Sequence, residues 1–203
     1  MKSSQTAYFY DEALMPPTFT ICGMKLRPFC LGHFLILRQL KSPLNGENEI
    51  EVNFTDGIYW LFHALIVCAL SYEDNLELLN DDDKFASIFK EFSDKLVKNM
   101  ELDKNWNIHE KLMLFKQYMA YFMEMPMYTG EGEGSTKAPS GTDWCSNIFV
   151  IFKSHLGYTE SEILNMNFRK LFYEWCNYAE ENGAIQVSNK TTLAQHRLAK
   201  QRQ

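Results

Sequence analysis

Three residues in the C-terminal half of the chain are of the types that could support nucleophilic catalysis. Cys145, His155 and Cys176 supply two thiols and an imidazole, and a thiol activated by a histidine can attack an electrophilic carbon. Each of them falls inside or beside an apolar helical stripe, however, where inert thiols and a hydrogen-bonded core histidine are typical. The sequence therefore predicts no catalytic residue, and an enzyme of this Cys/His kind is the least favoured functional hypothesis.

The histidines and acids form no pattern typical of a metal site. None of the five histidines lies four residues from another histidine or from a cysteine. Asp81, Asp82 and Asp83 are adjacent, so they cannot all face one ion on a helix, and they suit the start of a helix instead. The glycines between Gly130 and Gly134 lack the lysine of a phosphate-binding loop. We expect no metal and no cofactor.

A methionine-rich stretch favours binding over bond-making chemistry. Five of the ten methionines fall within fifteen positions and are accompanied by tyrosines: Met113, Met119, Met123, Met125, Met127, Tyr121 and Tyr128. The flexible, polarizable methionine side chain suits a surface that accepts several apolar partners. These seven residues are the predicted contacts with a protein partner, and the competing interpretation is that they fill an irregular core.

The elements that position these residues are expected to be helices. Near residues 28–40 and 56–70, apolar side chains cover almost the whole circumference of a helix, which is typical of helices at the centre of a domain. Pro28 suits the first helical turn, and Thr55 or Asp56 can serve as an N-cap.

Amphipathic stripes predict further helices around this centre. Phe85, Ile88, Phe89, Phe92 and Leu96 recur at helical spacing, and similar stripes begin near residues 107, 143, 159 and 167. The sequence thus predicts an all-α fold, a compact single-domain bundle of about six or seven helices with two central apolar helices.

The domain organisation follows from composition. The chain has 203 residues, of which 46% are hydrophobic, enough for one sizeable core. We expect a helical domain over 26–183, a flexible N-terminal arm over 1–25 and a basic tail over 184–203. Within the domain, glycines and prolines predict a mobile loop over 126–142. Short runs at 18–22 and 185–187 could be extended.

Charge and cysteine usage restrict the partners and the compartment. The net charge is −6, which disfavours nucleic acid as a partner. The last twenty residues differ from the rest, because they hold four basic residues and no acidic one. The longest uncharged apolar stretch, 58–72, is shorter than the roughly 20 residues of a membrane span. The five cysteines form no CxxC pair, which predicts free buried thiols in a reducing compartment. With no apolar signal core near the N-terminus, a cytoplasmic location is expected.

Several short motifs occur in an order that resembles a known group of proteins. They are Leu26-Arg27-Pro28-Phe29, Leu31-Gly32-His33, Ser42-Pro43-Leu44, Val67 to Ser71, Trp144, the helix start from Gly157 to Leu164, and Trp175 to Gly183. Over residues 24 to 183 the chain resembles the small helical tail assembly chaperones of tailed bacteriophages, which are encoded near the tape-measure protein.

The resemblance implies a viral, non-enzymatic protein in the host cytoplasm. Such a protein would coat the apolar helices of the tape-measure chain, or of another tail protein, until the tail tube polymerises around them. Exposed apolar helices aggregate unless they are covered, so the role is physically reasonable. The alternative is a viral structural or regulatory adaptor, such as a minor tail component or an inhibitor of a host defence protein. Self-association into a homo-oligomer stays open.

Overall fold

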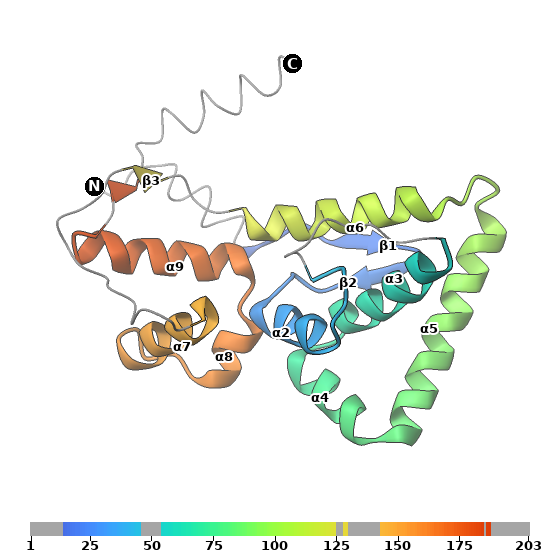
Figure 1. Ribbon diagram of the computed structural model, residues 1–203, viewed down its shortest axis with the longest axis horizontal. Helices are drawn as coiled ribbons and strands as arrows, with labels where there is room; N and C mark the ends of the chain where they lie inside the picture. Colours follow the sequence, from blue (N-terminus) through green and yellow to red (C-terminus); the bar gives the residue numbers. More distant parts are fainter. Residues whose placement is uncertain (1–13, 46–53, 125–127, 130–142, 185, 188–203) are drawn as a thin grey trace, which may run out of the picture. The chain divides into compact units, whose positions relative to one another are not determined.

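The computed structural model describes residues 14–45, 54–124, 128–129, 143–184 and 186–187, and these residues form mainly helices (Figure 1). The helices are α2 (Leu31–Gln39), α3 (Phe54–Ala69), α4 (Tyr72–Asn80), α5 (Asp82–Leu102), α6 (Ile108–Met123), α7 (Trp144–Ser154), α8 (Glu160–Asn165) and α9 (Phe168–Glu181). The strands are β1 (Phe19–Ile21), β2 (Met24–Leu26), β3 (Tyr128–Thr129) and β4 (Gln186–Val187). The predicted all-α class is confirmed, with eight helices in the described ranges.

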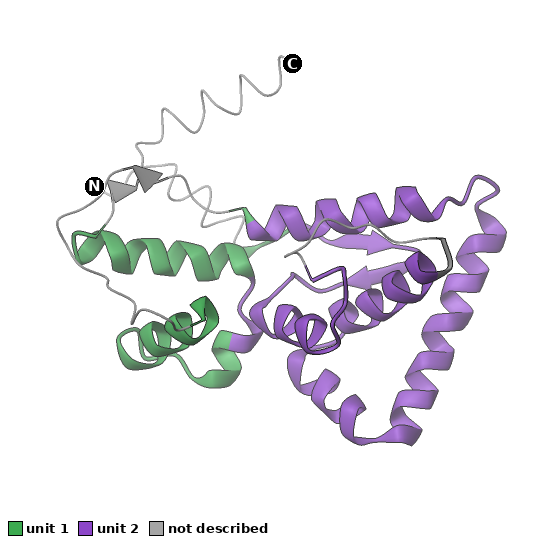
Figure 2. Ribbon diagram, viewed as in Figure 1, with its two compact units in different colours: residues 1–16, 124–163, 168–203 green, residues 17–123, 164–167 purple. Residues whose placement is uncertain are grey.

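Contacts between residues divide the chain into two compact units (Figure 2). Unit 2 comprises residues 17–123 and 164–167, and unit 1 comprises residues 1–16, 124–163 and 168–203. The sequence predicts one helical domain over 26–183, whereas the structure divides that range between the two units. Hydrophobic periodicity identifies the buried face of each helix but does not show which faces share a core.

The helices α2 and α3 lie at the centre of unit 2, as their apolar circumference predicts. Leu31 and Leu37 of α2 are fully buried, and so are Leu61 and Leu65 of α3. Burying such a side chain contributes about 1.5–3 kcal/mol relative to leaving it in water. These two helices therefore form the hydrophobic core against which the other elements of unit 2 pack.

Helix α2 begins three residues later than expected, so the prediction that Pro28 lies in its first turn is wrong. Cys30 is extended, with φ −125° and ψ 169°, and it forms an isolated β-bridge with Asn167. The Arg27 N–H also donates to the Cys68 carbonyl at 2.9 Å. Because the backbone groups of Arg27 and Cys30 are engaged outside the helix and Cys30 is extended, the helix starts only at Leu31.

Gly32 lies where α2 passes closest to other segments of unit 2. A Cβ atom at this position would lie 2.7 Å from Cδ2 of Tyr72 and 2.9 Å from the carbonyl oxygen of Leu164. Both separations are shorter than van der Waals contact, and the second involves backbone that cannot rotate away. The glycine thus permits the close packing of α2 against the start of α4 and the end of α8.

The strands β1 and β2 form an antiparallel hairpin in which Phe19 lies opposite Leu26. Its turn residues, Cys22 and Gly23, have φ values of 51° and 73°, and a type I′ turn requires positive φ at both positions. The hairpin confirms the extended run expected near residues 18–22. It also means that the arm predicted over 1–25 includes an ordered element, while residues 1–13 lie outside the described ranges.

Helix α6 packs against the rest of unit 2 through an aromatic cluster around Tyr118. The Tyr118 ring is fully buried, and its centroid lies 5.3 Å from that of Phe19, 5.9 Å from that of Phe29 and 5.4 Å from that of Phe122. The Tyr118 hydroxyl donates to the Arg27 carbonyl at 2.7 Å. Burial raises the pKa of this phenol well above its ordinary value, so the hydroxyl keeps the proton that it donates.

Unit 1 contains α7 and α9, with their apolar sides buried at Phe152 and Phe168. The helix start expected near residue 159 is a capping box, because the Thr159 N–H donates to Glu162 and the Glu162 N–H donates to Thr159 Oγ1. Arg169 is only 1% exposed, and its Nη2 donates to Glu124 Oε2 at 2.5 Å. A buried guanidinium requires such a counter-charge.

The remaining predicted segments fall mostly on residues that are not described. Strand β3 pairs antiparallel with β4, so the extended run expected at 185–187 is confirmed for its last two residues. Otherwise the loop predicted over 126–142 lies outside the described residues, as does the basic tail after Val187. All five cysteines are free and buried, as predicted. Among the described residues, the helices are too short or too polar to span a bilayer.

Candidate functional site

The described part of the methionine-rich stretch does not form a continuous exposed surface. Met113 of α6 is 42% exposed, whereas Met119 is buried at 4% and Met123 is half-buried. Because residues six positions apart on a helix point in different directions, Met113 and Met119 lie on different faces of α6. Met119 therefore belongs to the core of unit 2, as the competing interpretation of these methionines requires.

The two tyrosines of the same stretch occupy different environments. Tyr121 is half-buried, and its ring lies 5.5 Å from that of Phe19 and 5.0 Å from that of Phe122. The backbone of Tyr128 lies in β3, and Met125 and Met127 fall outside the described residues. The assignment of this stretch to a partner accordingly stays a prediction.

The thiols and the imidazole considered for nucleophilic chemistry are buried or point elsewhere. Cys145 and Cys176 are 4% and 2% exposed. The imidazole of His155 lies on the exposed side of unit 1, with its centroid 5.3 Å from that of Tyr178. Tyr178 and Cys176 are two positions apart on α9, so they point to different sides of that helix. Burial also raises the pKa of the Cys176 thiol to about 12, which keeps it protonated at neutral pH.

The three adjacent aspartates act as the start of α5, as predicted. The Asp81 carboxylate accepts a hydrogen bond of 2.9 Å from the Lys84 N–H, and Asp82 and Asp83 lie in the first turn. Carboxylates at this end of a helix interact favourably with its dipole. Within the described ranges, no cluster of three or more His, Cys, Asp or Glu side chains is placed to hold a metal ion.

A surface that the sequence did not single out lies where α5 crosses α3 in unit 2 (Figure 1). It consists of Tyr59 and His63 of α3 and Phe85 and Phe89 of α5, and we call it the aromatic surface. Tyr59 is 54% exposed, Phe85 39% and Phe89 36%. These values place the rings of Tyr59, Phe85 and Phe89 in reach of another molecule, and the half-buried His63 lies between them.

The four rings follow one another across the two helices. The Tyr59 and His63 centroids are 4.1 Å apart, those of His63 and Phe89 are 6.2 Å apart, and those of Phe89 and Phe85 are 5.7 Å apart. The Nδ1–H of His63 donates to the Tyr59 carbonyl at 2.8 Å, which orients its ring. Phe89 also contacts the buried Phe62 edge-on at 4.8 Å. The exposed rings are therefore continuous with the core of unit 2.

The stripe of α5 explains why these rings remain accessible. Its later members, Phe92 and Leu96, are buried at 8% each, whereas Phe85 and Phe89, nearer the start of the helix, are only partly covered. One face of α5 thus changes from buried to exposed toward its N-terminus. The same stripe of α5 thus packs into unit 2 at its later positions and presents two phenyl rings at its earlier ones.

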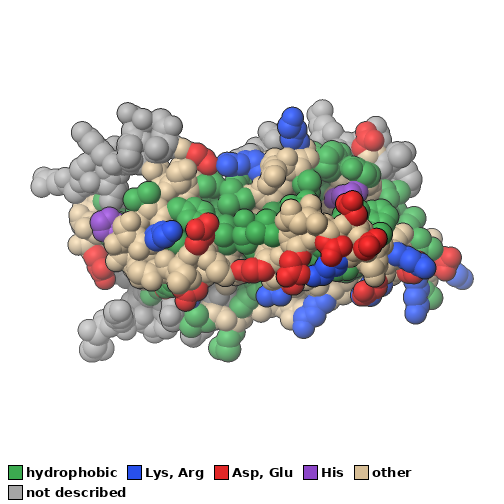
Figure 3. Space-filling model, turned by 90° about the horizontal axis from the view of Figure 1, so that it is seen from below, with side chains coloured by type: hydrophobic (Ala, Val, Ile, Leu, Met, Phe, Trp, Pro, Cys, Tyr) green, Lys and Arg blue, Asp and Glu red, His purple; other side chains and the backbone are tan. Residues whose placement is uncertain are grey.

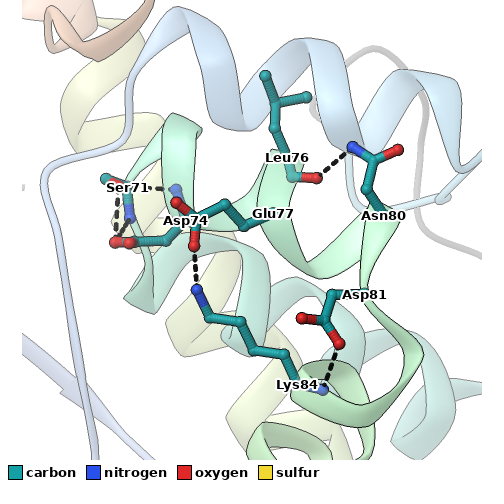
Figure 4. Close-up of polar contacts among 7 residues, drawn as sticks. All are labelled: Ser71, Asp74, Leu76, Glu77, Asn80, Asp81 and Lys84. Atoms are coloured by element: carbon teal, nitrogen blue, oxygen red, sulfur yellow. Dashed lines mark hydrogen bonds and ion pairs between the residues drawn. The ribbon is translucent and has the colours of Figure 1, made fainter.

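Figure 4 shows polar contacts of α4 and of the corner at which α4 meets α5. This corner fixes the start of α5. Ser71 Oγ accepts from the Asp74 N–H at 3.1 Å, and the Asp74 carboxylate accepts from the Ser71 hydroxyl at 2.6 Å. The hydrogen bond from the Ser71 hydroxyl lowers the pKa of the Asp74 carboxyl. The Lys84 ammonium pairs with the Glu77 carboxylate across the corner, and this contact raises the pKa of Lys84. Side-chain hydrogen bonds thus cap the start of α4, and an ion pair between α4 and α5 spans the corner.

Sequence reasoning missed the aromatic surface because it assigned Phe85 and Phe89 to an ordinary buried stripe. A signal was present in α3, but it is a single pair of residues. The aromatic pair Tyr59-Trp60 in that helix is the type found where apolar surface meets water.

Comparisons of the chain with protein families, with curated proteins and with solved structures find no match. Among the described residues, the exposed aromatic surface on α3 and α5 is the feature best suited to bind another molecule.

Proposed function

We propose that this protein is a non-catalytic binding protein that covers apolar helices of a longer partner chain, as a phage tail assembly chaperone does for the tape-measure protein in the host cytoplasm. The observation that carries the proposal is the aromatic surface, in which Tyr59, Phe85 and Phe89 are each more than a third exposed. Covering large apolar side chains that contact water lowers the free energy of the system and so favours binding.

The shape of the surface suits a helix as the partner element. Its rings extend over two crossing helices, and an apolar helix face binds in this way through side chains at positions i, i+3, i+4 and i+7. Aromatic contacts of this kind require no particular sequence in the partner. They would allow one protein to cover many successive segments of a long apolar chain.

Co-expression tests the proposal. The soluble recovery of apolar helical fragments of the tape-measure protein is measured with the wild-type chain, with the double variant F85S/F89S and with no added chain. We expect recovery to rise with the wild type and to fall to the level of the fragments alone with F85S/F89S. A matched control is V97S/L102S, because Val97 and Leu102 are 49% and 74% exposed on the same helix but lie outside the aromatic surface.

Two results would contradict the proposal. Unchanged recovery with the wild-type chain would remove the chaperone role, and equal loss in both double variants would remove the aromatic surface as its site. Mass spectrometry of purified virions distinguishes the alternative adaptor role, since an assembly chaperone is absent from the finished particle and a minor tail component is retained.

A further inference from the structure

The aromatic surface is flanked by acidic side chains on both of its helices. On α3, the exposed Asp56 lies one turn before Tyr59, and on α5 the exposed Asp82 lies one turn before Phe85. Residues three apart on a helix are neighbours on its surface, so each carboxylate lies beside the first ring of its helix. The two helices thus present the same order of acid and aromatic side chain.

The acidity extends over α4 and the corner that leads into α5. Residues 72–84 contain six carboxylates and one lysine, Lys84, which pairs with Glu77. On the face shown in Figure 3, acidic and hydrophobic side chains lie next to one another over this part of unit 2. The first exposed lysine of α5 after that pair is Lys90, which follows the last ring of the surface.

We infer that the segment bound at the aromatic surface is an amphipathic helix that carries lysine or arginine beside its apolar face. The inference rests on the proposed function and specifies the partner of the same site. The apolar face of the helix covers Tyr59, Phe85 and Phe89, and its cations lie toward Asp56 and Asp82. Carboxylates at the edge of an apolar contact select partners of opposite charge and accelerate their association.

The carboxylates at the edge of the aromatic surface also disfavour acidic partners. An acidic amphipathic helix would place like charges beside Asp56 and Asp82, which is unfavourable at the edge of an interface. A second copy of this chain would bring its own acidic corner against the first. A basic helix is therefore the occupant that satisfies both the apolar and the charged part of the surface.

The test uses two synthetic peptides of roughly 18 residues, about five helical turns each. They share one leucine stripe at i, i+3, i+4 and i+7 and differ only in their flanking residues, which are lysine in one peptide and glutamate in the other. Binding to the full chain is measured by fluorescence anisotropy at low and at high salt. We expect the lysine peptide to bind at least about fivefold more tightly at low salt, with the difference shrinking as salt screens the charges.

Matched variants assign the preference to particular side chains. D56N/D82N should reduce the preference for the lysine peptide, whereas D94N/E101Q should preserve it, because Asp94 and Glu101 are exposed on the side of α5 opposite Phe85. F85S/F89S should weaken the binding of both peptides. Circular dichroism of each variant confirms that the fold is retained.

The outcomes separate this inference from the proposed function. Equal binding of the two peptides, with both weakened by F85S/F89S, would overturn the basic partner and preserve the aromatic surface as a binding site. Tighter binding of the glutamate peptide, or no binding of either, would also overturn the inference, whereas failure of the co-expression test would overturn the function. A dimer that F85S/F89S dissociates would show that a second copy occupies the surface and would equally overturn the inference.

Discussion

The Nε2–H of His33 donates to the Leu70 carbonyl at 2.8 Å, so a fully buried imidazole joins α2 to the end of α3. Its Nδ1 accepts a hydrogen bond of 3.4 Å from the Cys30 N–H. A donor at one nitrogen and an acceptor at the other define the neutral imidazole. This arrangement makes the stability of unit 2 depend on the charge of one side chain.

Acid should destabilise the protein through His33. Burial lowers the pKa of His33 from 6.5 to about 4 in the folded chain, so the unfolded chain binds the proton more readily. The contribution of the neutral His33 to the free energy of unfolding is complete above pH 6.5 and is lost as the pH falls toward 4. The total loss is about 3 kcal/mol. Urea unfolding between these pH values measures the slope.

The variant H33Q serves as the control for this slope. Its amide can still donate to the Leu70 carbonyl but does not titrate, so the free energy of unfolding should vary less between pH 6.5 and 4 than in the wild type. An identical slope in the two proteins would show that His33 is not the group responsible.

The variant G32A should lower the free energy of unfolding by about 1–3 kcal/mol, the usual range for an overpacked position. Its Cβ would lie 2.7 Å from Cδ2 of Tyr72 and 2.9 Å from the Leu164 carbonyl oxygen. In the double variant G32A/Y72A the first contact is absent, so the added effect of G32A should be smaller than in the wild-type background. Strictly additive effects in chemical denaturation would contradict the close approach of Gly32 and Tyr72.

Loss of the cap on α4 should also be measurable. In S71A the Asp74 N–H loses its side-chain acceptor, and removing such a cap costs about 1 kcal/mol. The matched substitution S87A, at an exposed position inside α5, should change the free energy of unfolding by no more than about 0.5 kcal/mol. Equal effects in thermal or urea unfolding would indicate that Ser71 has no special role.

The five thiols should react slowly in the folded protein. All five are buried, and burial raises the pKa of Cys22 to about 11 and that of Cys30 to about 12, so little thiolate forms at pH 8. We expect a thiol-specific chromogenic reagent to modify all five at once only in denaturant. Rapid labelling of Cys145 or Cys176 in the native state would revive the Cys/His hypothesis.

The helices of this protein were predictable because their signals are local. The full apolar circumference of residues 56–70 predicts the buried helix α3, and the aspartates at 81–83 predict the start of α5. The start of α2 was not predictable, since the Arg27 and Cys30 backbone groups bond to residues far along the chain. Hydrophobic periodicity describes one helix at a time. The exposure of Phe85 and Phe89 depends instead on how much of α5 is covered by α3, so it could not be predicted from the sequence.

Asp81 is both the C-cap of α4 and the N-cap of α5, so a single residue connects the two helices. A one-residue connection allows little change in the orientation of α5 relative to α4. Insertion of one residue into the first turn of α5 would turn Phe85 and Phe89 by about 100° about the helix axis relative to this junction and carry them away from α3. The spacing of the chain at this joint, as much as the identity of the rings, determines what the protein can present to another molecule.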